Sequence, residues 1–314
     1  MGCGSASETP QSTETEKVSV EDPDFDADSA YFFLAKQVSF SPRVPNTKAH
    51  RDCADFLINT LSQYADTVIS MPIAAKAYNG TTLHGQNIVG VFNPQAHKRI
   101  LLAAHWDSRP YADYDPDPAN RRTPIDGAND GASGVAVLLE IARQLRLNPA
   151  EIGVDIIFFD LEDYGAPQDE RTAGGDNFWC LGSQQWAKNQ HVKNYQARYG
   201  ILLDMVGGKN AQFSKEKISM QYAPDVVEKV WYRAALLGFG SYFQNKESTH
   251  ILDDHWFVNE GTNIPMIDII EYDANSNTGF NKNWHTLSDN LDNIDKEILT
   301  VVGKVLLSVI RSEK

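Results

Sequence analysis

Residues 99–163 decide the fold of this chain, because they contain RILLAAHWDS (99–108), GASGVAVLLEIARQLRL (131–147) and VDIIFFDLED (154–163). The first and third segments are short apolar runs without strict polar alternation, which is typical of strands buried on both faces. The second segment places apolar residues at helical spacing and ends at Asn148-Pro149. A strand, a helix and a second strand in this order predict two parallel strands joined by a helical crossover.

The same alternation continues on both sides of this unit. Further apolar runs of strand length are NIVGVFN (87–93), ILLDMVGG (201–208) and IPMIDIIEYD (264–273). Apolar residues at helical spacing predict helices over residues 46–64, 224–238 and 292–312. We therefore expect one α/β domain over residues 31–314, with a central, mostly parallel mixed sheet flanked by helices.

The first 30 residues differ in composition from the rest of the chain. They are rich in Ser, Thr, Asp and Glu and nearly free of apolar residues, so we expect a disordered acidic tail. Cys3, followed by Gly4 and Ser5, looks like the lipid-acceptor start of a mature bacterial lipoprotein, which would make the tail a tether. That interpretation predicts an exported, periplasmic protein whose export signal has been removed. An ordinary Cys in a flexible terminus is an equally good interpretation.

Composition excludes several classes of partner and site. The formal net charge of −14 argues against nucleic acid and anionic membranes, because both would call for a Lys/Arg surface. No run approaches the ~18 apolar residues that span a bilayer. The three cysteines, Cys3, Cys53 and Cys180, are too few and too unevenly spaced for a disulfide framework or a clustered zinc site. Cys53 lies on an apolar helical face, so we expect it to pack in the core.

Polar side chains gather where four of the apolar runs end. They are His105 and Asp107, Glu162 and Asp163, Asp204, and Glu271 and Asp273. Ligand sites of open α/β sheets lie at the carboxyl ends of the strands. These ends are therefore the predicted location of a functional site.

Each candidate residue also has a structural interpretation when it is taken alone. Asp130 precedes an apolar helix and could be its cap, Glu162-Asp163 could be an exposed acidic loop, and His285 a loop histidine. Taken together, an Asp, an adjacent Glu-Asp pair and a distant His are what a zinc site with a general base requires. Three such ligands leave one tetrahedral position open for substrate.

Six motifs occur in a fixed order along the chain. They are AAHWDS (103–108), DGANDGASGVAVLLEIAR (126–143), FFDLED (158–163), LLDMVGG (202–208), DDHWFVNEGTNIPMI (253–267) and NWHTLSDN (283–290). With these motifs the chain resembles the M28-like zinc aminopeptidase superfamily and, within it, bacterial members of the animal-type (type II) glutaminyl cyclases. The resemblance runs from about residue 46 to the C-terminus.

The resemblance implies an activity, a cofactor and a set of site residues. The activity is glutaminyl-peptide cyclotransferase, which closes the N-terminal glutamine of peptides or proteins to pyroglutamate and releases ammonia. The cofactor is one zinc ion per chain. The implied ligands are Asp130, Asp163 and His285, the general acid/base is Glu162, its acidic partners are Asp204 and Asp253, and the pocket walls are Trp179, Phe280 and Trp284.

The chain departs from the animal enzymes in three places. Glu162-Asp163 stands where the mammalian enzymes have Glu-Glu, which shortens the metal-binding arm by one methylene. Residues 164–178 do not match the animal loop, so Trp179 could equally be a core residue. The cysteine pair of the family has no counterpart here.

Two other functions fit the same residues. A two-zinc aminopeptidase would add His105 and Asp204 as ligands, use Asp130 as the bridge and let Glu162 activate water. Trp284 directly before His285, and Asp253 where peptidases usually carry a smaller hydroxyl residue, favour the cyclase. An inactive, peptide-binding lipoprotein would require a missing ligand or base, and none is missing from the sequence.

Overall fold

The computed structural model describes residue 1, residues 22–171 and residues 175–314. Six strands form the central sheet in the order β1-β2-β4-β3-β5-β8. They are β1 (Thr67–Lys76), β2 (Thr82–Phe92), β3 (Arg99–His105), β4 (Gly153–Phe159), β5 (Gly200–Asp204) and β8 (Met266–Ile270). Strands β4, β3, β5 and β8 are parallel, whereas β1 and β2 form an antiparallel hairpin at one edge. The mixed, mostly parallel sheet predicted from the sequence is confirmed.

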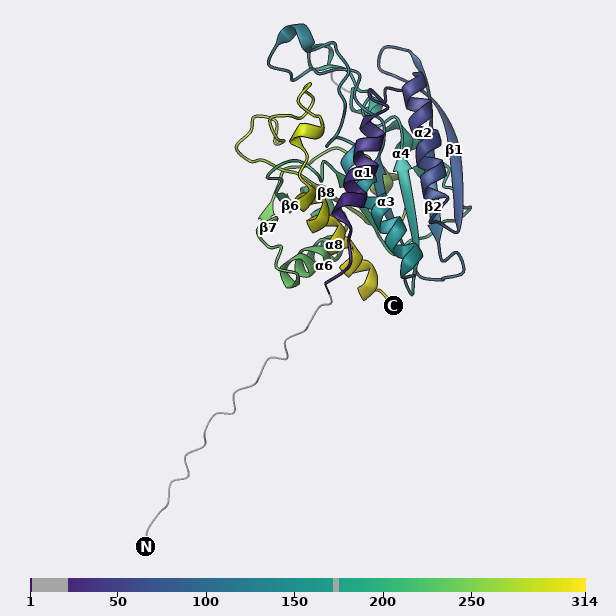
Figure 1. Ribbon diagram of the computed structural model, residues 1–314, viewed down its shortest axis with the longest axis vertical. Coiled ribbons are helices and arrows are strands. Elements are labelled where there is room, and N and C mark those ends of the chain that lie inside the picture. The colour runs from purple at the N-terminus through teal and green to yellow at the C-terminus, as the bar shows by residue number, and fades with distance from the viewer. Residues whose placement is uncertain (2–21, 172–174) are drawn as a thin grey trace.

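Helices cover both faces of this sheet (Figure 1). One face carries α1 (Ala27–Val38), α2 (Lys48–Leu61), α3 (Ala132–Leu147), α6 (Pro224–Leu236) and α8 (Lys296–Ser312). Helices α1, α3 and α8 lie side by side toward the viewer in Figure 1. The opposite face carries α4 (Leu181–Lys188) and α7 (Asp254–Gly261), while α5 (Lys217–Tyr222) packs against the edge strand β8. A separate pair, β6 (Phe213–Lys215) and β7 (Phe243–Glu247), lies beyond that edge.

The core explains why the central strands lack polar alternation. In β3, Leu102 and Ala104 pack with the helices of one face, and Leu101 and Ala103 pack with those of the other face. All four side chains are fully buried, as expected for a strand covered on both sides. Cys53 is buried in the larger core cluster, which confirms its expected packing role.

The domain begins earlier than the predicted boundary at residue 31. Helix α1 starts at Ala27, and the side chain of Asp26 caps it by accepting bonds from the backbone N–H groups of Asp28 and Ser29. Residues 27–30 therefore belong to the folded domain. Cys3 lies outside the described residues.

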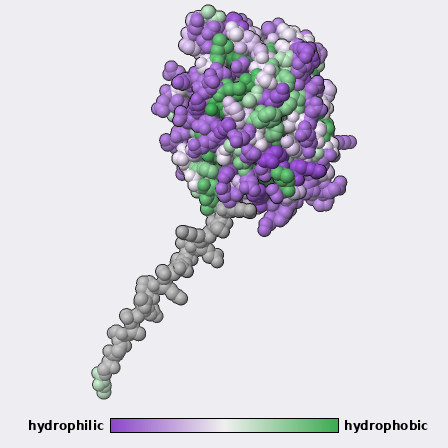
Figure 2. Space-filling model, viewed as in Figure 1, coloured by the Kyte–Doolittle hydropathy of each residue, from purple (hydrophilic) through white to green (hydrophobic). Residues whose placement is uncertain are grey.

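The visible surface is mainly polar. Figure 2 shows hydrophilic side chains around most of one face, with an area where hydrophobic residues reach the surface between them. Among the described helices, none combines the length and the apolar character that crossing a bilayer requires.

Candidate active site and metal centre

The site lies where the strand order of the sheet reverses. Strands β4 and β5 follow β3 in the chain but lie on opposite sides of it, and such a switch point opens a crevice at the carboxyl ends of the strands. A cavity of about 270 Å³ occupies this position. Its lining includes all nine residues selected from the sequence: Asp130, Glu162, Asp163, Trp179, Asp204, Asp253, Phe280, Trp284 and His285.

Three of these residues form a group that fits a metal ion. One ligand atom from each of Asp130, Asp163 and His285 lies within 4.8 Å of the other two. The Nε2 atom of His285 is 3.4 Å from Asp130 Oδ2 and 3.5 Å from Asp163 Oδ1. Tetrahedral zinc with bonds of about 2.0–2.1 Å separates neighbouring ligand atoms by about 3.3–3.4 Å, so both spacings suit it. The buried Oδ2 atom of Asp163 has no hydrogen-bond partner, which leaves it free for a ligand bond.

The sequence left open whether Asp130 caps the helix that follows it. In the structure it does not. The cap position of α3 is Gly131, at φ +113°, and no side chain caps the helix. A Cβ atom at Gly131 would lie 2.6 Å from the His105 ring, so only glycine fits between the two. The Asp130 carboxylate faces His105 and His285, with its oxygens 3.0 Å and 3.4 Å from their Nε2 atoms. The carboxylate of Asp289 accepts the Asp130 backbone N–H.

A buried arginine holds two members of the site in place. The Arg109 guanidinium donates two bonds of 2.8 Å to Asp113 and one of 3.1 Å to Asp163 Oδ1. Asp113 in turn lies 3.4 Å from Nδ1 of His285, the ring atom opposite the candidate ligand atom. A carboxylate in this position orients a metal-binding histidine. Neither Arg109 nor Asp113 was predicted from the sequence, although both closely follow the AAHWDS motif.

Glu162 lies beside the candidate metal group, which consists of Asp130, Asp163 and His285, and its side chain lines the cavity. Its side chain is 12% exposed, whereas Asp163 next to it is buried. The Cys180 thiol lies 3.2 Å from Oε1 of Glu162 and donates a hydrogen bond to it. Burial, together with the charges of Asp163 and Asp253, raises the pKa of Glu162 well above its usual range, although His105 opposes the shift. A carboxyl group with a raised pKa can both accept and donate a proton near neutral pH.

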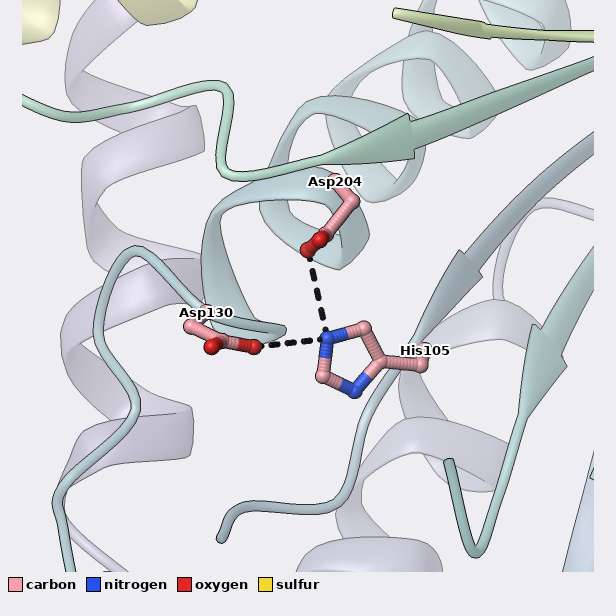
Figure 3. Close-up of side chains that lie close together, drawn as sticks. All are labelled: His105, Asp130 and Asp204. Carbon is pink, nitrogen blue, oxygen red and sulfur yellow. Dashed lines mark hydrogen bonds and ion pairs between the residues drawn. The ribbon is translucent and has the colours of Figure 1, made fainter. Parts of the chain in front are cut away.

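Asp204 and Asp253 have different neighbours. Figure 3 shows that Nε2 of His105 points between two carboxylates, 3.0 Å from Asp130 Oδ1 and 3.2 Å from Asp204 Oδ1. Asp204 therefore bonds to His105, where a bond to Glu162 was expected. Asp253 does lie near Glu162, because atoms of Glu162, Cys180 and Asp253 lie within 4.8 Å of one another.

Aromatic rings enclose the candidate ligand His285. The ring of Trp284 stacks on it with a centroid distance of 3.7 Å, and the Trp179 ring lies parallel to it at 6.3 Å. Phe280 packs against Trp284 at 4.6 Å. Trp179 is thus placed at the cavity and not in the core.

Three of the acidic residues at strand ends lie outside the cavity lining. Asp107 accepts the backbone N–H groups of Glu162 and Asp163 behind the cavity. Glu271 follows β8, but its carboxylate accepts bonds from the side chains of Asn281 and Asn129. Asp273 accepts a bond from the backbone N–H of Asn275 in the loop that follows. A position at the end of a strand is therefore not sufficient to predict that a residue lines the cavity.

Comparison with known proteins identifies the family. The sequence model of Peptidase family M28 matches residues 87–310. The chain belongs to Peptidase family M28. As an M28 protein it is similar to solved structures of a Zn-dependent exopeptidase from Parabacteroides distasonis, at 55% identity, and of a glutaminyl cyclase from Tannerella forsythia, at 54% identity. In both comparisons the TM-score is 0.91, and the match covers 93% of this chain and 100% of the other.

Animal proteins are more distant relatives of this M28 chain. The glutaminyl-peptide cyclotransferase of the snake Gloydius blomhoffii is 28% identical over 70% of this chain. The match spans 63% of the length of the Gloydius blomhoffii protein. The resemblance to bacterial and animal glutaminyl cyclases that the six motifs predicted is confirmed.

Proposed function

We propose that this M28 chain is a zinc-dependent glutaminyl-peptide cyclotransferase that acts on peptides or proteins with an N-terminal glutamine. The observation that carries the proposal is the combination of Glu162 with the group of Asp130, Asp163 and His285 in one aromatic-walled cavity. The 54% identity to the Tannerella forsythia glutaminyl cyclase supports it.

The reaction joins two groups of the same residue. The α-amine of glutamine attacks the carbon of its own side-chain amide, a ring C–N bond forms, and the bond to the amide nitrogen breaks to release ammonia. Zinc bound by Asp130, Asp163 and His285 would supply a Lewis acid for the amide carbonyl. Glu162 takes a proton from the attacking amine and returns one to the departing nitrogen. Protons therefore balance without an added water molecule.

The surroundings of Glu162 support this double use. Asp253 is buried beside it, and close carboxylates cannot all ionise at low cost, so the cluster retains a proton. Trp179, Phe280 and Trp284 offer apolar surface to the methylene groups of glutamine. Excluding water from the bound substrate favours ring closure over hydrolysis.

A two-zinc aminopeptidase is the second candidate, because a second group could hold a metal ion. It consists of His105, Asp130 and Asp204, and it shares Asp130 with the first group. We infer one zinc per chain, with His105 bonded to the two carboxylates instead of to a metal. Metal analysis of protein purified without chelator tests the stoichiometry. Two tightly held zinc ions, one of them lost in His105→Ala, would favour the aminopeptidase.

Product analysis separates the candidate activities directly. The protein is incubated with Gln-Ala and Ala-Ala peptides, and mass spectrometry distinguishes loss of ammonia from addition of water. We expect loss of ammonia from Gln-Ala only, at a rate above that of a sample without protein. Hydrolysis of Ala-Ala would identify a peptidase, and no change in either peptide would indicate a binding protein.

We infer a periplasmic location and a lipid anchor at Cys3 from the Cys-Gly-Ser start of the acidic tail. Mass spectrometry of the protein from its native host, compared with a Cys3→Ser variant, tests this. An unmodified Cys3 in the native protein would contradict the anchor.

A further inference from the structure

The cavity has charges of opposite sign at its base and at its rim. Asp130, Asp163 and Asp253 at the base are buried. At the rim, Arg171 and His250 are exposed. Among the described residues that line the cavity, Arg171 is the only one with a permanent positive charge. This is notable in a chain with a net charge of −14.

Among the residues whose side chains the structure describes near this position (22–171 and 177–314), none places a carboxylate within ion-pair distance of the Arg171 guanidinium. Its guanidinium lies over the Trp179 ring, 5.3 Å from the centroid, and its Nε donates a long bond of 3.4 Å to the Ala166 carbonyl. The acidic residues that precede it are paired elsewhere: Arg122 binds Asp169 at 2.8 Å and Glu170 at 2.9 Å. Among these described side chains Arg171 thus has no competing carboxylate. Its contact with Trp179 places it at the wall of the cavity that the proposed function assigns to glutamine, the glutamine cavity.

A second hollow continues outward from the same residues. It shares Arg171, Thr278, Phe280 and Trp284 with the glutamine cavity, and adds Tyr114, Gln168 and Asn277. A peptide whose first residue occupies the inner cavity can extend along this shared wall, because the two hollows have these residues in common. The second hollow gives space and polar side chains to the residue that follows.

We propose that Arg171 forms a subsite for a carboxylate on the residue after the N-terminal glutamine, so that the enzyme prefers peptides with Glu or Asp in that position. The proposal rests on the proposed function, because it places the glutamine in the inner cavity. An arginine fork binds a carboxylate through two parallel hydrogen bonds. Since Arg171 is exposed, we expect a preference of roughly 2-fold to 5-fold in kcat/KM, which high salt reduces.

Two matched peptides test the preference. They are Gln-Glu-Ala-amide and Gln-Gln-Ala-amide, which have the same size and differ only in the charge of the second residue. Ammonia release is measured for the wild type, Arg171→Gln and the control Arg146→Gln, whose arginine is also exposed but lies in the last turn of α3, away from the cavity lining. We expect the wild type and Arg146→Gln to prefer the Glu peptide through KM. Arg171→Gln should lose that preference, because its KM for the Glu peptide rises to the value for the Gln peptide.

Equal kcat/KM for both peptides in the wild type, or a preference that survives Arg171→Gln, would overturn the proposal. Binding of the two corresponding pyroglutamyl peptides, followed by titration calorimetry, separates this failure from failure of the proposed function. If no glutaminyl peptide is cyclised, tighter binding of the Glu peptide that depends on Arg171 still supports the subsite. Equal binding in that case contradicts both proposals.

Discussion

Glu162 and Asp163 are neighbours in the chain, but the proposed mechanism gives them different tasks. Glu162→Gln keeps the size of the side chain and removes proton transfer, so we expect zinc to stay bound and kcat to fall by about 10² or more. Asp163→Ala removes a candidate ligand, so zinc itself should be lost. Zinc content and turnover are measured on the same preparations. Near-normal turnover of Glu162→Gln would contradict the proton-transfer role.

Cys180 is a buried residue whose contact with Glu162 predicts an effect on turnover. Burial and the Glu162 charge raise the pKa of its thiol well above the usual value, so the thiol stays protonated and donates to Oε1. Cys180→Ala removes this donor and should lower kcat by about 5-fold to 10-fold, the effect of one hydrogen bond of about 1 kcal/mol. Cys180→Ser should retain most of the activity because it keeps a donor.

Cys53→Ala is the matched control, because Cys53 is equally buried but packs in the apolar core. It should lower the free energy of unfolding and leave kcat unchanged. If Cys180→Ala behaves like Cys53→Ala, the thiol only fills space. Kinetics and chemical denaturation on all three variants distinguish the two results.

The candidate metal ligands and substrate-binding side chains could be predicted from the sequence, whereas the side chains that hold them in place could not. Asp130, Glu162 and His285 belong to motifs whose order is itself informative. Arg109 and Cys180 act through contacts with residues 54 and 18 positions away. Such contacts follow from how the loops fold back on the sheet, and no local pattern in the chain encodes them.

The packing of α3 on the central strands positions Asp130 of the candidate metal group, and Gly134 allows that packing. A Cβ atom at Gly134 would lie 2.3 Å from the backbone carbonyl oxygen of Leu203, the residue before Asp204. In an exposed helix Gly→Ala stabilises by up to about 1 kcal/mol. Here the helix or β5 must move, and we expect Gly134→Ala to destabilise the fold by about 1–3 kcal/mol. Chemical denaturation measures the change.

Gly303→Ala in α8 is the comparison for this prediction. A Cβ atom there would lie 2.1 Å from the ring of Phe25, which is a side chain near the start of the folded domain and can move aside. We expect a smaller loss of stability than for Gly134→Ala. Equal losses would show that the Leu203 carbonyl is not a special obstacle.

Some elements could not be predicted from the sequence, for different physical reasons. Strand β1 is largely exposed, so it lacks the apolar run that marked the central strands. Helix α4 follows Cys180, an N-cap residue in the left-handed conformation. Both α4 and α7 contain 8 residues, too few for a clear periodicity. Predicted strand ends also ran too far: the run at 99–108 stays a strand only to His105. Beyond His105 the chain leaves the sheet, and the residues that follow, such as Arg109, contact the site.

The pH dependence of stability should reflect Glu271. Burial raises its pKa to about 7 in the folded protein, from an ordinary value of 4.5. A raised pKa means that the folded state binds the proton more tightly, so the stabilising contribution is complete below pH 4.5 and is lost as pH rises through about 7. Glu271→Gln stays neutral and can still accept the bonds from Asn129 and Asn281.

We therefore expect Glu271→Gln to be more stable than the wild type above pH 7, by up to about 3 kcal/mol, and similar to it near pH 4.5. Urea denaturation at several pH values measures the difference. A constant difference across this range would mean that ionisation of Glu271 does not contribute.

The substrate should set the pH dependence of catalysis on the acidic side. The proposed nucleophile is the α-amine of a peptide, which titrates at roughly 7.7–8.0, so most of the substrate is protonated and unreactive below that range. The rate constant kcat/KM refers to the free substrate and the free enzyme, and it should rise with pH until the amine is deprotonated. A hydrolytic peptidase does not use this amine as its nucleophile, so its profile need not follow the amine pKa.

Two glutaminyl peptides with α-amines of different basicity decide between these cases. If the amine is the nucleophile, the acidic limb of the kcat/KM profile moves with the amine pKa, because only the deprotonated substrate can attack. A group on the enzyme titrates at the same pH whichever peptide is present, so it would give identical limbs. Profiles recorded at constant ionic strength keep screening of the acidic protein surface equal for both peptides. Coinciding acidic limbs would assign the limiting ionisation to the enzyme and count against cyclisation by a free amine.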